Sequence, residues 1–171
     1  VITCIYGLIL RIYMDLAGYT DIAIGTARLF GFTIMENFNR PLLQKNIGLY
    51  WRNWHISVYT WIRDYVFFPF FGYRSSPLKL YAGSFFILFL FMIWHEGTLG
   101  FFLAGIYHGV GIVTWQLFRS YTQPRPTIRK FLEQPWCSCF FVFATYNFIS
   151  FGVLLYTFNR SQILFILKAL F

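Results

Sequence analysis

The residue whose surroundings first suggest chemistry is His95. It stands in FMIWHEG, at the end of YAGSFFILFL, a run without a charged side chain. Imidazole titrates close to neutral pH, so His95 could take a proton from a hydroxyl group. Such a base needs an acceptor hydroxyl and an activated acyl group within hydrogen-bond reach. Glu96 could orient His95 or cap a helix starting near Thr98, and spacing alone leaves both roles open.

Two further histidines, His55 and His108, complete the set. His108 lies in AGIYHGVG, among small residues at spacings that suit close helix contact, and we interpret it as a packing residue rather than a catalyst. The three histidines lack the spacing of zinc ligands, so we expect no metal. No P-loop, GxGxxG, HExxH, nucleophile-elbow or paired-carboxylate pattern occurs. The small residues around His108 are Gly100, Ala104, Gly105, Gly109 and Gly111.

The segment from Asn46 to Phe71 predicts an amphipathic helix that lies at the membrane interface or is re-entrant. At helical spacing, one stripe is aromatic and an adjoining stripe is polar. We expect the polar stripe to face protein or an aqueous vestibule, because contact with lipid costs too much. The aromatic stripe is Trp51, Trp54, Val58, Trp61 and Tyr65, and the polar stripe is Arg52, His55, Tyr59 and Arg63.

Composition places the chain in a membrane. Hydrophobic residues make up 58% of it, aromatic residues 24% and charged residues only 12%, whereas a soluble domain has about 25% charged residues. The net charge of +8 is spread among aromatic residues, without the polar surface module of a nucleic-acid-binding protein, so we exclude nucleic acid as a partner. Basic short loops and interfacial Trp and Tyr are typical of multi-span proteins.

Three apolar segments, Leu78 to Trp94, Leu99 to Phe118 and Trp136 to Phe158, approach the roughly 20 residues that a bilayer requires. The segment from Arg119 to Pro135 contains four basic residues, one acidic residue and three prolines, so we expect an irregular loop on the cytoplasmic side. The basic stretch GYRSSPLK, two crossings earlier, predicts the same side.

The first part of the chain mixes apolar and charged residues. A charge at the bilayer centre costs about 2.5 to 3.5 kcal/mol on insertion scales, so Arg11 and Asp15 should pair on one helix face. We expect a buried ion pair between packed helices, with a direct chemical role as the alternative. Cys4, Cys137 and Cys139 lack metal-ligand spacing and are interpreted as packing residues. The N-terminus has no Met and no basic region of a signal peptide, so we expect a fragment of a longer chain.

Four stretches, in this order, resemble the membrane-bound O-acyltransferase (MBOAT) family: YMDLAGYTDIAIGTARLFGF, ENFNRPLLQKNIGLYWRNWHISVYTWIRDYVFFP, MIWHEGTLGFFLAGIYHG and FNRSQILFILKALF. Nearly the whole chain is covered, and the combination of WRNWHIS, WIRDY and WH followed by HG is specific. The chain is most similar to the bacterial branch that acetylates alginate and related exopolysaccharides, with teichoic-acid D-alanyl transferases as cousins. Glu96 stands where that branch usually has glycine.

The resemblance implies an all-α, multi-pass bundle of which residues 1–171 form one partial domain, without the N-terminal helices and the extreme C-terminus. It implies acyl transfer to a hydroxyl, with His95 as the catalytic histidine and His55 as a second functional residue. Neighbouring residues in the same motifs are expected to support catalysis. We interpret His108, Arg11 and Asp15 as structural residues. The supporting residues are Arg52, Arg63, Asp64, Trp94 and Glu96.

The resemblance also implies partners. An acyl thioester, acetyl-CoA or an acyl carrier protein, would be the co-substrate, and no bound cofactor is expected. The acceptor would be an extracytoplasmic polysaccharide, reached directly or through a shuttle protein, from a multi-pass position in the inner membrane. Two other classes stay open: a transporter that uses Arg11, Asp15, Asp21 and the histidines as an ion path, and an inactive scaffold.

Overall fold

A computed structural model describes residues 2–72, 76–158, 161–162 and 168. This part of the chain is helical and contains no β-strand, apart from one isolated bridge between Phe38 and Trp54. The predicted all-α class is therefore confirmed. The helices are α1 (Ile2–Leu29), α2 (Ile47–Asn53), α3 (Ile56–Ile62), α4 (Phe68–Phe71), α5 (Pro77–His95), α6 (Leu99–Thr122), α7 (Pro126–Leu132) and α8 (Pro135–Thr157), with a 3₁₀ turn, η1 (Pro41–Leu43), and a π-helical turn, η2 (Arg63–Phe67).

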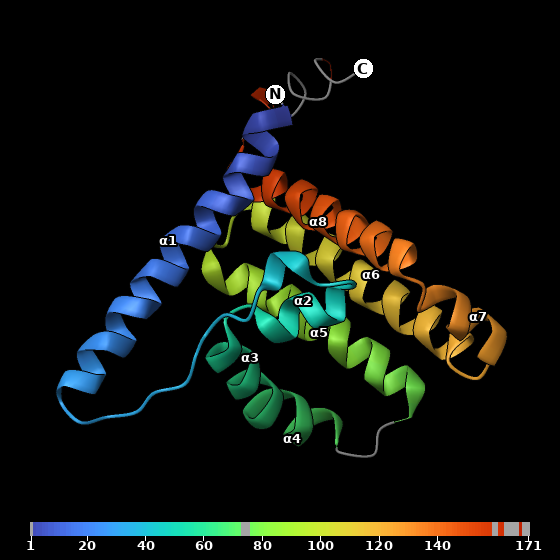
Figure 1. The fold of residues 1–171 in the computed structure, drawn as a ribbon, viewed down its shortest axis with the longest axis horizontal. Helices are drawn as coiled ribbons and strands as arrows, with labels where there is room; N and C mark the ends of the chain where they lie inside the picture. Colours follow the sequence, from blue (N-terminus) through green and yellow to red (C-terminus); the bar gives the residue numbers. More distant parts are fainter. Residues whose placement is uncertain (1, 73–75, 159–160, 163–167, 169–171) are drawn as a thin grey trace.

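Three helices, α5, α6 and α8, are long and apolar enough to cross a membrane, which confirms the predicted spans. They lie side by side, with α6 between α5 and α8 (Figure 1). Most of their apolar side chains are not covered within the described chain, as expected for helices that face lipid or further protein. The basic stretch before α5 includes residues 73–75, and the motif from Phe158 onward falls largely on residues outside the described ranges.

Glycines of α6 explain why these helices approach closely. A methyl group at Gly105 or Gly109 would press against Phe89 or Phe85 of α5, at 3.0 and 2.6 Å. A methyl group at Gly100 would lie 2.6 Å from a backbone oxygen of α8. The small residues near His108 thus form two faces of α6, one for each neighbouring helix, and the close helix contact predicted from their spacing is confirmed.

Helix α1 packs against α8 near its N-terminal end and then diverges from the bundle (Figure 1). The Tyr6 hydroxyl donates to Asn147 Oδ1 at 2.6 Å, and the Tyr146 hydroxyl donates to the carbonyl of Tyr6. Arg11 and Asp15 do pair, with 3.6 Å between Nε and Oδ2. Their side chains are 78% and 71% exposed, however, so the prediction of a buried pair is wrong for this chain. Both residues lie on the exposed side of α1, whereas Ile12 and Tyr13 of the same turn pack against the core.

The single amphipathic helix predicted from Asn46 onward is interrupted. The helix does begin after Asn46, whose side chain accepts a hydrogen bond from the amide of Leu49. It ends at Asn53, because the Asn53 carbonyl accepts a hydrogen bond from Asn39 and the amide of Ile56 donates to Asn37 instead of to the preceding turn. Tertiary hydrogen bonds thus replace the helical ones. The sequence has no Gly or Pro at the break that would have predicted it.

Two other details also differ from expectation. The break rotates the second half of the segment, so that Trp51 and Trp54 are buried whereas Trp61 and Tyr65 are exposed. The loop from Arg119 to Pro135 contains a short helix, α7, which begins at Pro126. Proline at the first helical position needs no hydrogen-bond acceptor for an N–H, so a proline-rich segment can start helices instead of preventing them.

Candidate active site

A cavity of about 540 Å³ lies between α2, α3 and η2 on one side and α5 and α6 on the other. Its apolar walls include Trp51, Phe91 and Trp115. The polar stripe predicted from the sequence, Arg52, His55, Tyr59 and Arg63, lies along the same cavity, so the prediction that these residues face protein or a vestibule is confirmed. The break in the helix does not separate them, because α2 and α3 both border the cavity.

Cationic side chains gather at this cavity. Arg52, Arg63 and Arg119 line it, and none of the described lining residues is acidic. Arg52 and Arg119 also line an adjoining recess of about 340 Å³, and the Arg119 guanidinium lies 5.7 Å from the centre of the Trp115 ring. Such a lining suits an anionic group attached to an apolar or planar body.

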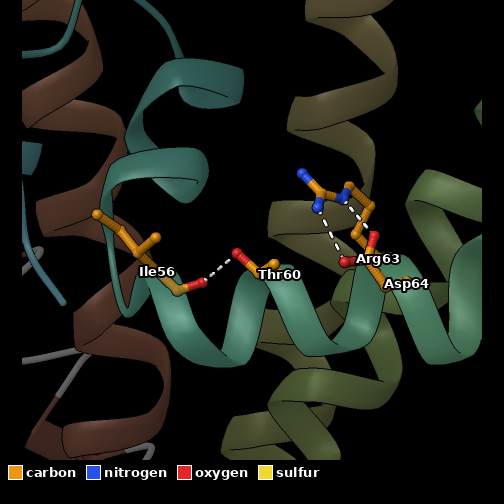
Figure 2. A network of polar contacts seen from close by, with 4 residues as sticks. All are labelled: Ile56, Thr60, Arg63 and Asp64. Carbon is orange, nitrogen blue, oxygen red and sulfur yellow. Dashed lines mark hydrogen bonds and ion pairs between the residues drawn. The ribbon is translucent and has the colours of Figure 1, made fainter. Parts of the chain in front are cut away.

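Arg63 also holds the neighbouring Asp64 through two hydrogen bonds, from Nε to Oδ1 at 2.7 Å and from Nη2 to Oδ2 at 2.9 Å (Figure 2). The hydrogen bond from Arg63 is the main reason that the pKa of Asp64 is lowered. In the preceding turn, the Thr60 hydroxyl donates to the carbonyl of Ile56 (Figure 2). The π-helical turn that carries Arg63 precedes Pro69, which lacks an N–H and cannot continue a regular helical ladder.

His55 occupies the break between α2 and α3 in a left-handed backbone conformation, with φ 51° and ψ 55°. That conformation costs a non-glycine residue about 1–2 kcal/mol. Three hydrogen bonds to Asn37 Oδ1 surround the break: the amide of Ser57 donates at 3.0 Å, the Ser57 hydroxyl donates at 2.9 Å, and His55 Nδ1 lies at 3.3 Å. Asn37 therefore holds the segment that presents His55 to the cavity.

Burial lowers the pKa of His55, and the nearby His95 imidazole lowers it further. Both effects disfavour the charged ring, the first through desolvation and the second through repulsion between like charges. His55 is consequently neutral at neutral pH. His55 and Phe91 line the same cavity, and His95 packs against Phe91, so the structure places near one cavity the two histidines to which the sequence assigned chemistry, although they are forty positions apart.

His95 ends α5, one helical turn after Phe91. The Phe91 ring meets the imidazole edge-on, with centroids 4.8 Å apart, and the Phe101 ring stacks on the imidazole with centroids 6.1 Å apart. Phe91 also lines the cavity, so His95 contacts a residue of the cavity wall. The His95 side chain is exposed in the described chain.

The two neighbours of His95 are exposed as well. Glu96 follows α5 in an extended conformation, and Trp94 borders a separate apolar recess between α3 and α5. Thr98, the residue before α6, makes no capping hydrogen bond through its own side chain. The two roles weighed for Glu96 thus stay predictions, as does the supporting role of Trp94.

His108 lies inside the bundle, 2% exposed. Trp51 and Phe148 meet its ring edge-on, with centroids 5.2 and 5.7 Å away. Its Nδ1 is buried without a hydrogen-bond partner among the described residues. This enclosure between α2, α6 and α8 is what a packing residue requires, and it supports the interpretation of His108 drawn from the sequence.

Several residues of the site were not singled out in the sequence. Asn37, which contacts the lining residue His55, lies in ENFNRP, where nothing marks it as functional. Trp115 and Gln116 come from the apolar segment within α6, and Arg119 comes from the last turn of that helix. The side-chain amide of Gln116 donates to Ser84 of α5 at 2.8 Å. Arg11 and Asp15 do not reach the described lining of this cavity. Within the described ranges, no three His, Cys, Asp or Glu side chains gather as a metal-binding group.

Comparison with known proteins gives consistent relatives. The probable alginate O-acetylase AlgI of Pseudomonas aeruginosa is 39% identical over 100 residues, which are 58% of this chain and 19% of that protein. The teichoic acid D-alanyltransferase of Bacillus subtilis is 29% identical over 162 residues, 89% of this chain and 40% of that protein. The peptidoglycan O-acetyltransferase of Helicobacter pylori is 30% identical over 141 residues, 82% and 25% of the two chains.

The chain thus spans between about a fifth and two fifths of the length of these relatives. The family described as MBOAT, membrane-bound O-acyltransferase, matches residues 1–158, which include both site histidines, the arginine-lined cavity and all three spans. With a membrane helical bundle, a histidine pair and this match in agreement, the chain belongs to the membrane-bound O-acyltransferase family.

Proposed function

We propose that the full-length protein is an inner-membrane O-acyltransferase that moves an acetyl group from a thioester donor towards a hydroxyl of an extracytoplasmic polysaccharide. The observation that carries the proposal is that His55 lines an arginine-lined cavity whose wall includes Phe91, the residue against which His95 packs. The family of the chain supports acyl transfer. The names of the alginate and peptidoglycan relatives support acetyl as the group and a polysaccharide as the acceptor.

In the proposed reaction, His95 acts as the general base. Its unprotonated nitrogen takes the proton of the acceptor hydroxyl while the hydroxyl oxygen attacks the thioester carbonyl carbon. The bond from carbon to sulfur then breaks, and the departing thiolate takes the proton from the imidazolium of His95. A positioned base of this kind contributes about 10²- to 10⁴-fold in rate.

The cavity supports a place for the donor. Acetyl-CoA and an acylated carrier protein both carry phosphate beside a pantetheine arm. Arg52 and Arg119 supply guanidinium groups for phosphate, and the aromatic walls suit the thin apolar arm. The thioester would pass Phe91 to reach His95. Both donor classes fit this chemistry, and the acceptor could be the polysaccharide itself or an extracytoplasmic shuttle protein that carries the acyl group.

D-alanyl transfer is a second candidate within the same chemistry. The teichoic acid D-alanyltransferase of Bacillus subtilis aligns with 89% of this chain, more than the 58% that aligns with AlgI of Pseudomonas aeruginosa. The same base and the same cavity would serve, because both reactions move an acyl group from a thioester to a hydroxyl. Acyl transfer to a lipid or peptide hydroxyl is a further alternative.

Full-length protein in sealed vesicles, supplied with thioester labelled in the acyl group, tests the proposal. Label should move to a polysaccharide or shuttle protein, and His95→Gln should lower the rate about 10²- to 10⁴-fold. His108→Gln, at matched expression, should have the mildest effect of the three histidine variants. Ion flux without label transfer would favour a transporter, and the absence of both would favour a scaffold. Equal losses in all three variants would indicate a shared structural role.

A further inference from the structure

The hydrogen bonds around Asn37 determine which nitrogen of His55 carries its proton. The amide N–H of Ser57 can only donate, so the Asn37 atom that it meets at 3.0 Å must be the carbonyl oxygen Oδ1. The Ser57 hydroxyl donates to the same oxygen at 2.9 Å. The asparagine amide cannot be flipped without setting its NH₂ group against the Ser57 N–H.

His55 Nδ1 lies 3.3 Å from this oxygen. A carbonyl oxygen has no proton to give, so the contact is favourable only when Nδ1 carries the hydrogen and donates. If Nδ1 were unprotonated, its lone pair would face the lone pairs of Asn37 Oδ1, and the contact would be repulsive. In the neutral ring the other nitrogen, Nε2, then carries the lone pair and acts as the hydrogen-bond acceptor.

The backbone conformation of His55 also restricts where its imidazole ring can lie. His55 has a left-handed conformation, and the amide of the next residue, Ile56, donates to the carbonyl of Asn37 at 2.9 Å. Strain in a non-glycine residue persists when surrounding contacts impose it, and such residues cluster at functional sites. Main chain and side chain of Asn37 thus both hold one histidine, which lines the arginine-rich cavity.

We propose that Asn37 is a positioning residue, which holds His55 in the tautomer with hydrogen on Nδ1 so that Nε2 accepts a hydrogen bond from an N–H or O–H group of a substrate in the cavity. This inference rests on the proposed function for its activity readout, but the tautomer itself does not. The charged and titratable groups around His55 are Arg52, Tyr59, Arg63, Tyr81 and Arg119 on the cavity wall and His95, which packs against Phe91 of that wall.

The first test is spectroscopic and needs no turnover. Full-length protein in detergent, with histidine labelled by ¹⁵N, should show the Nε2 signal of His55 as unprotonated at neutral pH, with the signal assigned by its loss in His55→Gln. Asn37→Ala should convert His55 to a mixture of tautomers. Ser57→Ala is the matched control, since it removes another hydrogen bond to Asn37 Oδ1 and leaves the contact to His55. A protonated Nε2 in the wild-type protein would overturn the proposal.

The second test is the pH profile of transfer. Asn37→Asp keeps the oxygen acceptor but adds a negative charge, which favours the imidazolium and protonates Nε2. The acidic limb of the profile should move up by about one pH unit or more, so that transfer at pH values well below the wild-type midpoint falls about tenfold and recovers at higher pH. If the pH profile of Asn37→Asp coincides with that of the wild type, or if Ser57→Ala shifts the profile equally, Asn37 supports only the structure of the loop and the proposal is wrong. Loss of all transfer in the wild-type protein would instead refute the proposed function and leave the spectroscopic result standing.

Discussion

Gly152 of α8 lies directly against the imidazole of His108 on α6. A methyl group at Gly152 would lie 2.5 Å from His108 Nε2 and 3.2 Å from the Tyr107 ring. The His108 ring is enclosed by other rings as well, so it cannot turn away without disturbing Trp51 or Phe148. The position of this buried histidine is therefore tied to the distance between α6 and α8.

Gly152→Ala should destabilise the protein by about 1–3 kcal/mol, the usual cost of overpacking a filled interior. The thermal midpoint of the purified full-length protein in detergent measures it. His108→Ala, combined with Gly152→Ala, should recover part of the loss, because the smaller side chain leaves room for the methyl group. A double variant whose losses simply add would show that Gly152 and His108 do not share this contact.

The spans and their packing could be predicted from the sequence because each rests on a local pattern. Apolar runs of sufficient length mark α5, α6 and α8 whatever their neighbours are. The small residues around His108 likewise indicate that other helices approach α6 closely. They do not indicate that some of these residues face α5 and others face α8. That division depends on how the helices are arranged in space, which no single segment encodes.

The pH dependence of stability should reflect His55. Its pKa is lowered from the usual 6.5 by burial and by His95. Stability that depends on the neutral ring is fully present above about pH 6.5 and is lost as pH falls through the lowered folded pKa, because the unfolded state then binds more protons. Thermal midpoints measured between pH 8 and 5 should fall on the acidic side, and His55→Gln should lessen that fall. An equally steep fall in the variant would assign the effect to other groups.

The arginines of the cavity should affect binding of the donor more than the chemical step. Arg52→Gln or Arg119→Gln removes a charge-assisted contact to phosphate, so KM for the thioester should rise about tenfold or more, with kcat nearly unchanged. Arg129→Gln is a matched control, because Arg129 pairs with Glu133 on α7 at 3.6 Å and lies outside the described lining. An equal rise in the control would indicate a general effect of surface charge.

The break in the helix at His55 could not be predicted from the sequence. The residues from Asn46 to Phe71 follow a helical pattern, and none of the residues near the break is a helix breaker. The break is imposed by Asn37 and Asn39, which take over backbone hydrogen bonds that a continuous helix would need. Hydrogen bonds from residues this far away in the chain do not change the spacing of apolar and polar residues from which a helix is predicted. The polar stripe still faces a single cavity, as predicted, because residues on both sides of the break border it.

The turn after α6 should be cytoplasmic, since four basic residues between Arg119 and Pro135 favour that side. Helix α6 has 24 residues, about 36 Å at 1.5 Å per residue, enough to place Gly97 and Gln123 on opposite sides of a bilayer. In a protein whose native cysteines are replaced by serine, Gln123→Cys should resist an impermeant maleimide until cells are opened, whereas Gly97→Cys should react in intact cells. Gln123 borders the arginine-lined cavity, so its side of the membrane is also the side from which the donor would enter. Rapid labelling of Gln123→Cys in intact cells, with protection of Gly97→Cys, would invert the topology and place the arginines on the wrong side for a cytoplasmic thioester.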